Sequence, residues 1–299
     1  MSNLAWEPAR RAWLLLAVLA FAPLLAPAAC ADVIATTYQP AKQTVPDFAG
    51  AVCSRAGMSA CYYGSENWTT WNGTNNYVSS FTDGGGNFTS AISITGTYTA
   101  GANTTTGVDW LKVNANQYGG QAGTDPYPEL YGPTAASAND PTAAENSYSA
   151  SFATKGLPGV NYFGIWISAL DAHNDLRLYN TAGQLVLDFT PADLIKALGA
   201  CPSSAYCGNP TAPFSGKDGN EQFAYVNFFD LTGYFGQVVL YDNGGTGFES
   251  SNHAVAYFDP NTPFGNALSV TGVPEPRGVA TLGVGIAALA LLRRRLARR

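Results

Sequence analysis

The 299-residue sequence predicts an all-β ectodomain of the β-sandwich or jelly-roll class with one short helix, between an N-terminal signal peptide and a C-terminal transmembrane helix. Three observations support this fold class. Short segments with the alternating pattern of strands recur between closely spaced turns, few segments have a helical period, and an apolar run lies near each end of the chain. Closely spaced strands without alternating helices are typical of sandwiches and jelly rolls.

Strand-like segments fill most of the chain between residues 88 and 258. In the first segment, residues 88–99, Phe, Ile and Tyr side chains alternate with small polar ones. The other predicted strands are residues 148–154, 162–170, 176–179, 185–189, 223–228, 235–241 and 254–258. Clusters of Gly, Asn and Asp at residues 83–86, 180–183 and 242–247 predict turns between them.

One helix is predicted after the strand that ends at residue 189. Thr190 is a suitable N-cap, and Pro191 takes the first helical position, where its missing N–H leaves no bond unmade. Apolar Leu194 and Leu198 follow at a helical spacing, and Gly199 marks the end of the helix.

Residues 32–259 are predicted to form one ectodomain. Residues 119–144 are rich in Gly, Pro, Ala and Asp, which favours a long surface loop of one sandwich; a linker between two smaller domains is the alternative. Residues 260–272 are predicted to be an exposed, extended stalk, because prolines in and after this segment discourage regular structure.

The amino-terminal end has the pattern of a signal peptide. Two arginines precede an apolar run, residues 12–26, and small residues up to Ala31 follow it. This predicts cleavage of residues 1–31, a mature chain that starts near Asp32, and Sec-type export machinery and signal peptidase as partners. Acylation of Cys30, as in a lipoprotein, is the alternative.

The carboxyl-terminal end combines a short polar motif, an apolar span and a cationic stop. The motif is Val273, Pro274, Glu275 and Pro276, and the stop contains Arg293, Arg294, Arg295, Arg298 and Arg299. As a helix, the span of residues 278–292 would be about 22 Å long, which is marginal against about 30 Å of hydrocarbon. The excess of arginines after the span places the carboxyl end in the cytoplasm and the bulk of the chain outside.

Two interpretations of this tail remain, a plain single-pass anchor or a processing signal. Glu275 stands between two prolines, which hold it in an extended conformation just outside the membrane and favour processing. The order of motif, span and arginines, residues 273–299, resembles the PEP-CTERM sorting signal of Gram-negative bacterial surface proteins. In that family an exosortase, a membrane-embedded cysteine transpeptidase-like enzyme, reads the Pro-Glu-Pro motif.

The body of the chain resembles the same family more loosely. Residues 162–168 and 174–179 look like the paired core strands of exosortase-dependent proteins, and residues 225–228 and 248–257 look like their closing strands. The resemblance implies a precursor anchored in the inner membrane, with an exosortase as partner, and then a location at the cell surface or in the extracellular matrix. Association with exopolysaccharide or biofilm is the implied role.

Four cysteines remain after removal of the signal peptide. They form two pairs eight and six residues apart, Cys53 with Cys61 and Cys201 with Cys207. Two local disulfides are the simplest arrangement in an oxidising compartment, although four cysteines allow three connectivities. A metal site of these cysteines is disfavoured because neither of the two histidines lies near either pair in the sequence.

The predicted ectodomain is acidic. Between residues 32 and 272 it contains 19 Asp and Glu residues but only 7 Lys and Arg residues. Nucleic acid is therefore an unsuitable partner, since a duplex requires a cationic face. The abundance of Gly, Thr, Asn, Ser and Tyr suits an extracellular protein among polysaccharides.

Two groups of residues are candidates for binding. Trp68, Trp71 and Tyr77 lie among Asn, Gly and Thr, so that they could stack on sugar rings if exposed; burial in a small core is the alternative for the tryptophans. Hard oxygen ligands for a calcium ion could come from Asp171, Asn174, Asp175, Glu249 and Asn252, with capping of turns and strand ends as the alternative. We expect no other cofactor.

The acidic residues and histidines that could be catalytic do not form the pattern of a known catalytic site. Acidic residues that follow strands more often form turns than catalytic pairs, and both histidines, His173 and His253, are expected in exposed loops. The sequence therefore predicts a non-catalytic surface or matrix protein. A carbohydrate-binding or glycoside-cleaving module delivered by the same route is the alternative.

Overall fold

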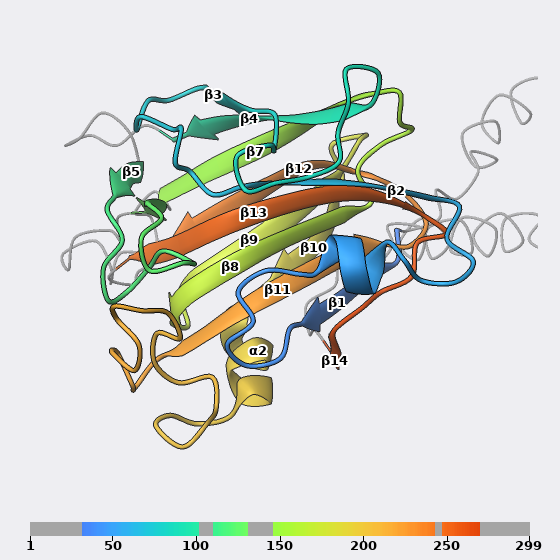
Figure 1. Ribbon diagram of the computed structural model, residues 1–299. Helices are drawn as coiled ribbons and strands as arrows, with labels where there is room; N and C mark the ends of the chain where they lie inside the picture. Colours follow the sequence, from blue (N-terminus) through green and yellow to red (C-terminus); the bar gives the residue numbers. More distant parts are fainter. Residues whose placement is uncertain (1–31, 102–109, 131–145, 243–246, 270–299) are drawn as a thin grey trace, which may run out of the picture. The chain divides into compact units, whose positions relative to one another are not determined.

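The computed structural model describes residues 32–101, 110–130, 146–242 and 247–269, which belong to one compact unit, residues 32–274. These residues form two antiparallel β-sheets packed face to face (Figure 1). The predicted all-β, sandwich-like fold is confirmed. The predicted signal peptide and the sorting tail lie outside the described residues.

The larger of the two sheets has eight strands and is called the large sheet below. Its order is β14 (Asn266–Leu268), β1 (Ile34–Tyr38), β11 (Gln222–Asp230), β8 (Tyr162–Leu170), β13 (Phe248–Asp259), β6 (Tyr127–Leu130) and β5 (Trp110–Val113), and β2 (Ala60–Glu66) also pairs with β13. On the side opposite β8, β13 pairs first with β6 and then with β2.

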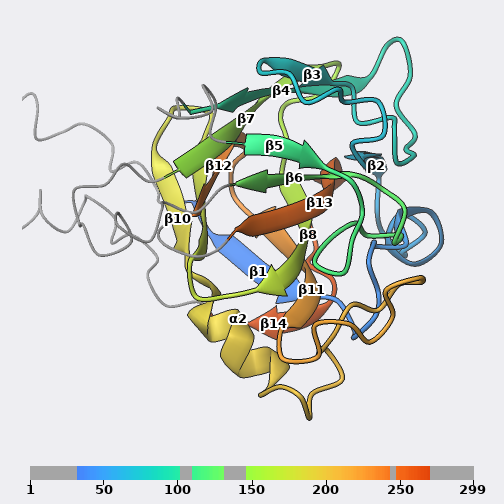
Figure 2. The ribbon, with the colours of Figure 1, turned by 90° about the vertical axis from the view of Figure 1, so that its left-hand side faces the viewer.

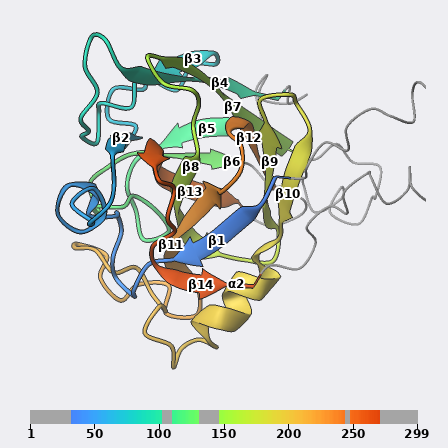
Figure 3. The same cartoon turned by 90° about the vertical axis from the view of Figure 1, so that its right-hand side faces the viewer.

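The six-stranded sheet, called the small sheet, covers one face of the large sheet, as the views in Figures 2 and 3 show. Its order is β10 (Leu185–Phe189), β9 (Asn174–Asn180), β12 (Phe235–Asp242), β7 (Asn146–Lys155), β4 (Ser93–Ala100) and β3 (Tyr77–Ser79). In β4 buried residues alternate with less buried ones, as expected for a sheet with one face packed and one face towards solvent.

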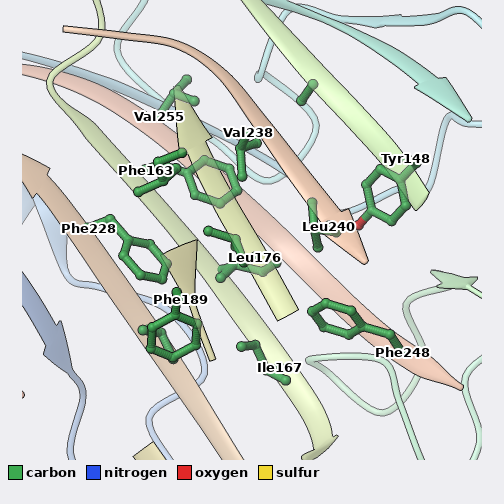
Figure 4. Close-up of a cluster of buried hydrophobic side chains, with 14 of the residues drawn as sticks. Tyr148, Phe163, Ile167, Leu176, Phe189, Phe228, Val238, Leu240, Phe248 and Val255 are labelled. Atoms are coloured by element: carbon green, nitrogen blue, oxygen red, sulfur yellow. The ribbon is translucent and has the colours of Figure 1, made fainter. Parts of the chain in front are cut away.

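The main core lies between the two sheets (Figure 4). Phe163 and Phe228 project from the large sheet, and Leu176, Val238 and Leu240 project from the small sheet. All five side chains are fully buried. In the small sheet these residues alternate with less buried ones along their strands, and this alternation is the signal that predicted those strands.

A second core covers the other face of the large sheet. It contains Tyr162, Trp166 and Phe229, and the π-helical turn η2 (Phe48–Val52) contributes Phe48 to it. The turn and the segment that follows it lie in front of the sheet in Figure 1. Because both faces are covered, every residue of β8 and β11 is buried, which gives these strands their almost continuous apolar sequence.

A β-bulge in β13 reverses which residues face the main core. The register with β8 shifts between Ser251 and Ala254, and Asn252 has a left-handed backbone with φ of 44°. Before the bulge Ser250 meets Tyr148 of the small sheet; after it His253 does so. Residues an odd number apart thus share one face of the strand.

The predicted helix forms as α2 (Pro191–Leu198). Thr190 is the N-cap residue, although its side chain donates or accepts no capping bond, and Gly199 ends the helix with a positive φ of 88°. Leu194 and Leu198 are buried against the main core.

Both predicted disulfides are confirmed. Cys53 is bonded to Cys61, with a Cα–Cα distance of 5.5 Å, and this bond ties the end of η2 to β2. Cys201 is bonded to Cys207, with a Cα–Cα distance of 5.6 Å, in the connection that follows α2. Each disulfide closes a local loop and leaves the pairing of the sheets to hydrogen bonds and burial.

The predicted stalk is wrong for its described part. Residues 266–268 form β14, which pairs with β1 at the edge of the large sheet, and Phe264 packs in the second core. The prolines of this segment therefore do not prevent a short edge strand, because proline is tolerated at sheet edges. The ectodomain extends beyond residue 259.

Part of the segment of residues 119–144 forms a strand of the large sheet. Tyr127–Leu130 form β6, which pairs with both β5 and β13, so that this part contributes to the same large sheet. The interpretation as one sandwich holds for the described residues, and residues 131–145 lie outside them. Strands β1, β2, β3, β5, β6 and β14 were not predicted from the sequence, because they are short or lack a clear alternation.

We expect the Asn161→Ala variant to lose about 2–4 kcal/mol of unfolding free energy. The buried Asn161 amide accepts from the Phe258 N–H at 2.9 Å and donates to the Phe258 carbonyl at 2.8 Å, so that its removal leaves two buried backbone groups unpaired. Urea unfolding measures the loss. Gln237→Ala, which removes an exposed amide bonded to Ser151, is the control and should cost less than about 1 kcal/mol; equal losses would contradict the assigned role.

Candidate functional site

Two carboxyl groups converge where β13 begins beside β6. Glu249 pairs with Glu129 across these strands. A Cβ atom added at Gly247 would lie 2.8 Å from Oε1 of Glu249 and 2.9 Å from Oε1 of Glu129. The missing side chain of Gly247 therefore leaves the small volume in which the two carboxyl oxygens meet.

Burial and neighbouring charges raise the pKa values of both carboxyl groups. Glu249 is only 9% exposed, and burial, followed by the charge of Glu129, raises its pKa to about 9. Burial and the charge of Asp242 also raise the pKa of Glu129. At neutral pH the pair therefore retains a proton, because two adjacent buried carboxylates cannot both ionise without compensation.

Asp171 and Asn174, two of the predicted calcium ligands, lie where the chain turns from β8 into β9, of which Asn174 is the first residue. The Asn174 amide donates to the Gly247 carbonyl at 3.0 Å, and its oxygen accepts from the Asp171 N–H at 2.9 Å. A carboxylate oxygen of Asp171 accepts from the His173 N–H. These groups cap the turn and hold it beside the start of β13.

The structure does not gather the five predicted calcium ligands into one site. Asn252 lies in the bulge of β13 and its amide donates to the Thr44 carbonyl, while Asp175 pairs with Tyr241 within the small sheet. In the described part of the chain, no group of three or more His, Cys, Asp or Glu side chains could hold a metal ion. The three carboxylates of the predicted calcium site, Asp171, Asp175 and Glu249, therefore do not form one such group.

Of the two interpretations of Trp68 and Trp71, the structure supports burial and not exposure. Trp68 and Trp71 are fully buried and meet edge to face, with ring centroids 5.1 Å apart. Trp68 also contacts Tyr98 and His253, and Trp71 contacts Trp110. Neither indole can stack on a sugar from this position, and the alternative of a buried core is the correct one for both.

Tyr77 donates a hydrogen bond to a buried carboxyl group beside these tryptophans. Glu66 is 1% exposed, and it accepts from the Tyr77 hydroxyl at 2.8 Å, the Ser79 hydroxyl at 2.6 Å and the Trp68 N–H at 2.7 Å. Burial is the main reason that the pKa of Glu66 rises to about 7. The hydroxyl of the half-buried Tyr77 therefore bonds to a buried group of the protein.

His253 lies at the centre of the main core, so its predicted place in an exposed loop is wrong. Its Nδ1 is 3.0 Å from the Tyr98 hydroxyl, and its Nε2 is 3.3 Å from both the Tyr148 hydroxyl and Ser250 Oγ. Burial lowers its pKa to about 3, so that the ring is neutral. This network joins β13 of the large sheet to β4 and β7 of the small sheet.

Sequence reasoning missed Glu129, Glu66 and the role of His253. Glu129 lies in a strand of four residues, Tyr127–Leu130, that follows a segment rich in Gly and Pro. The only sequence signal for Glu66 was a carboxylate close to two tryptophans. The bulge that turns His253 inward cannot be predicted from the alternation of apolar and polar residues in the sequence.

Comparisons with known proteins identify no relative. No family model matches the chain, and no curated protein and no solved structure matches it either. A search of the described residues for a helix long and apolar enough to cross a membrane also found none. The predicted span, residues 278–292, lies outside these residues.

We expect Glu249→Gln to stabilise the protein at pH 8 and to have little effect near pH 4. The folded state holds the Glu249 proton up to about pH 9, whereas the unfolded chain releases it above about pH 4.5, so wild-type stability falls as pH rises through this range. Glutamine removes that loss, and the gain should be about 1–3 kcal/mol in urea unfolding. Asp259→Asn, at an exposed carboxylate, is the control; a gain independent of pH would contradict the shared proton.

His253→Phe should destabilise the protein by about 1–3 kcal/mol at pH 7, because it leaves the buried Tyr98 hydroxyl without its partner. It should also reduce the loss of stability on acidification. The unfolded chain takes up the His253 proton below about pH 6.5 and the folded state only near pH 3, so this residue destabilises the fold as pH falls through that window.

The double variant His253→Phe/Tyr98→Phe tests this assignment. It should recover part of the loss at pH 7, because the unpaired hydroxyl is gone, and urea unfolding of the four proteins measures the coupling. Additive losses, or an acid sensitivity unchanged by His253→Phe, would show that the network does not act as described.

Proposed function

We propose that the chain is an exported, non-catalytic surface or extracellular-matrix protein that an exosortase sorts and that associates with exopolysaccharide. The observation that carries most weight is the formation of both disulfides within a sandwich of two β-sheets. Disulfides form and persist in oxidising compartments outside the cytosol. This agrees with a signal peptide at residues 1–31 and with a sorting signal at residues 273–299.

The sorting signal acts at the outer face of the membrane in this proposal. The arginines after residue 292 hold the carboxyl end in the cytoplasm, so that Glu275 and its flanking prolines face the exosortase outside. The short span makes a weak permanent anchor, and cleavage at the motif would separate the ectodomain from it. The partners are therefore the export machinery, signal peptidase and the exosortase.

The internal use of polar groups supports a structural role. The hydroxyl of Tyr77 and the ring of His253 make their hydrogen bonds inside the protein, and Asn174 caps a turn. The alternative of a carbohydrate-binding module loses its main support, because Trp68 and Trp71 are buried. Contact with polysaccharide would then depend on the hydroxyl- and amide-rich surface.

Intact-mass analysis of the protein from its native envelope and medium tests the proposal. Wild type is compared with Glu275→Ala, and Asp259→Ala is the control for an acidic residue of the ectodomain. We expect a wild-type and control chain that starts near Asp32 and lacks the residues after the Pro-Glu-Pro motif. We expect Glu275→Ala to retain them, since its motif cannot be read. A wild-type chain that still ends at Arg299 would contradict sorting and leave a plain anchor.

A further inference from the structure

A second pair of carboxylates, Asp32 and Asp230, lies where β1 begins beside the turn after β11. The Val33 N–H donates to Oγ1 of Thr232 at 2.9 Å, and the Leu231 N–H donates to the Val33 carbonyl at 2.8 Å. These bonds fix the segment that contains Asp32 against the turn that begins at Asp230.

Gly233 leaves a space in which the two carboxylates converge. A Cβ atom added at this glycine would lie 2.7 Å from Oδ1 of Asp32 and 3.0 Å from Oδ2 of Asp230. The two oxygens come from segments about 200 residues apart in the chain, and an alanine side chain would fill the space between them.

The Asp230 oxygen in this space is buried and unpaired. Asp230 is 1% exposed, and its Oδ1 accepts from the N–H groups of Thr232 at 3.1 Å and Gly233 at 2.7 Å. Its Oδ2 has no hydrogen-bond partner among the described residues. A buried carboxylate oxygen without a donor is costly, so a positively charged occupant would stabilise it.

Neighbouring side chains orient the oxygens of this space. The Asn180 amide donates to Oδ2 of Asp32 at 2.8 Å, which leaves Oδ1 towards Asp230. The Asn261 amide donates to the Asp230 carbonyl at 2.5 Å, and Oδ1 of Asn261 is buried without a partner in the described part of the chain.

The described residues place no cationic side chain beside this pair of carboxylates. No Lys or Arg in the described residues forms an ion pair with Asp32 or Asp230.

We propose that Asp32 and Asp230, around the space at Gly233, bind a divalent cation of the calcium class. The convergent carboxylate oxygens supply hard ligands, and water molecules would complete the oxygen shell that calcium requires. With only two carboxylates, the site belongs with the weak extracellular sites, whose dissociation constants are about 0.1–1 mM. The occupied site would clamp the start of β1 to the turn after β11.

Calcium titration of the exported protein, purified from cells and with its first residue defined by mass spectrometry, tests the site. We expect about 10 mM CaCl2 to raise the ratio of folded to unfolded protein about tenfold or more, measured by urea unfolding. Asp230→Asn and Gly233→Ala should each abolish this shift, the first by removing charge and the second by filling the space. Glu249→Gln, at the other carboxyl pair, is the matched control and should retain it.

A second form of the protein, extended by two residues before Asp32, identifies the occupant. If the new α-ammonium group of the mature chain fills the space, the unextended protein will be more stable than the extended one without calcium, and calcium will have no effect; this result overturns the proposal. A calcium shift that survives in both Asp230→Asn and Gly233→Ala also overturns it. Both measurements are independent of sorting, so a failure here leaves the exosortase proposal untouched.

Discussion

Both faces of the large sheet are apolar, so other parts of the ectodomain must pack against each of them. The small sheet covers one face, and η2 with its following segment covers the other. Apolar strands such as β8 would otherwise expose Tyr162 and Trp166 to water, at a cost of about 1.5–3 kcal/mol for each large side chain. The first disulfide holds the second cover in place, because it joins the end of η2 to β2.

The fold class could be predicted because alternation and turn chemistry are local properties. Strands β8 and β10 and helix α2 begin and end at the predicted residues, since each is bounded by a turn or a cap. The bulge in β13 could not be predicted in this way. It places Ser250 and His253 on one face although they are three residues apart, which breaks the period of two on which the prediction depends.

The candidate sites were predictable only where residues adjacent in sequence act together. Cys53 and Cys61 pair within one loop, and this was foreseen. The partners of Glu249 and Asp230 are distant in the chain and come from short segments at sheet ends. No spacing of residues in the sequence therefore predicts these pairs. Trp68 and Trp71 were misplaced because their polar neighbours suggested a surface, whereas the segment folds its indoles into the core.

The pairing of β1 with β11 and of β2 with β13 has a consequence for the order of folding. The first strands of the ectodomain find their partners only after nearly 200 further residues, so the large sheet cannot close while the chain is still emerging. Such high contact order slows folding. In the proposed export of the chain, this slow closure of the large sheet would keep the polypeptide unfolded during its passage. The two short-range disulfides can form early without imposing that closure.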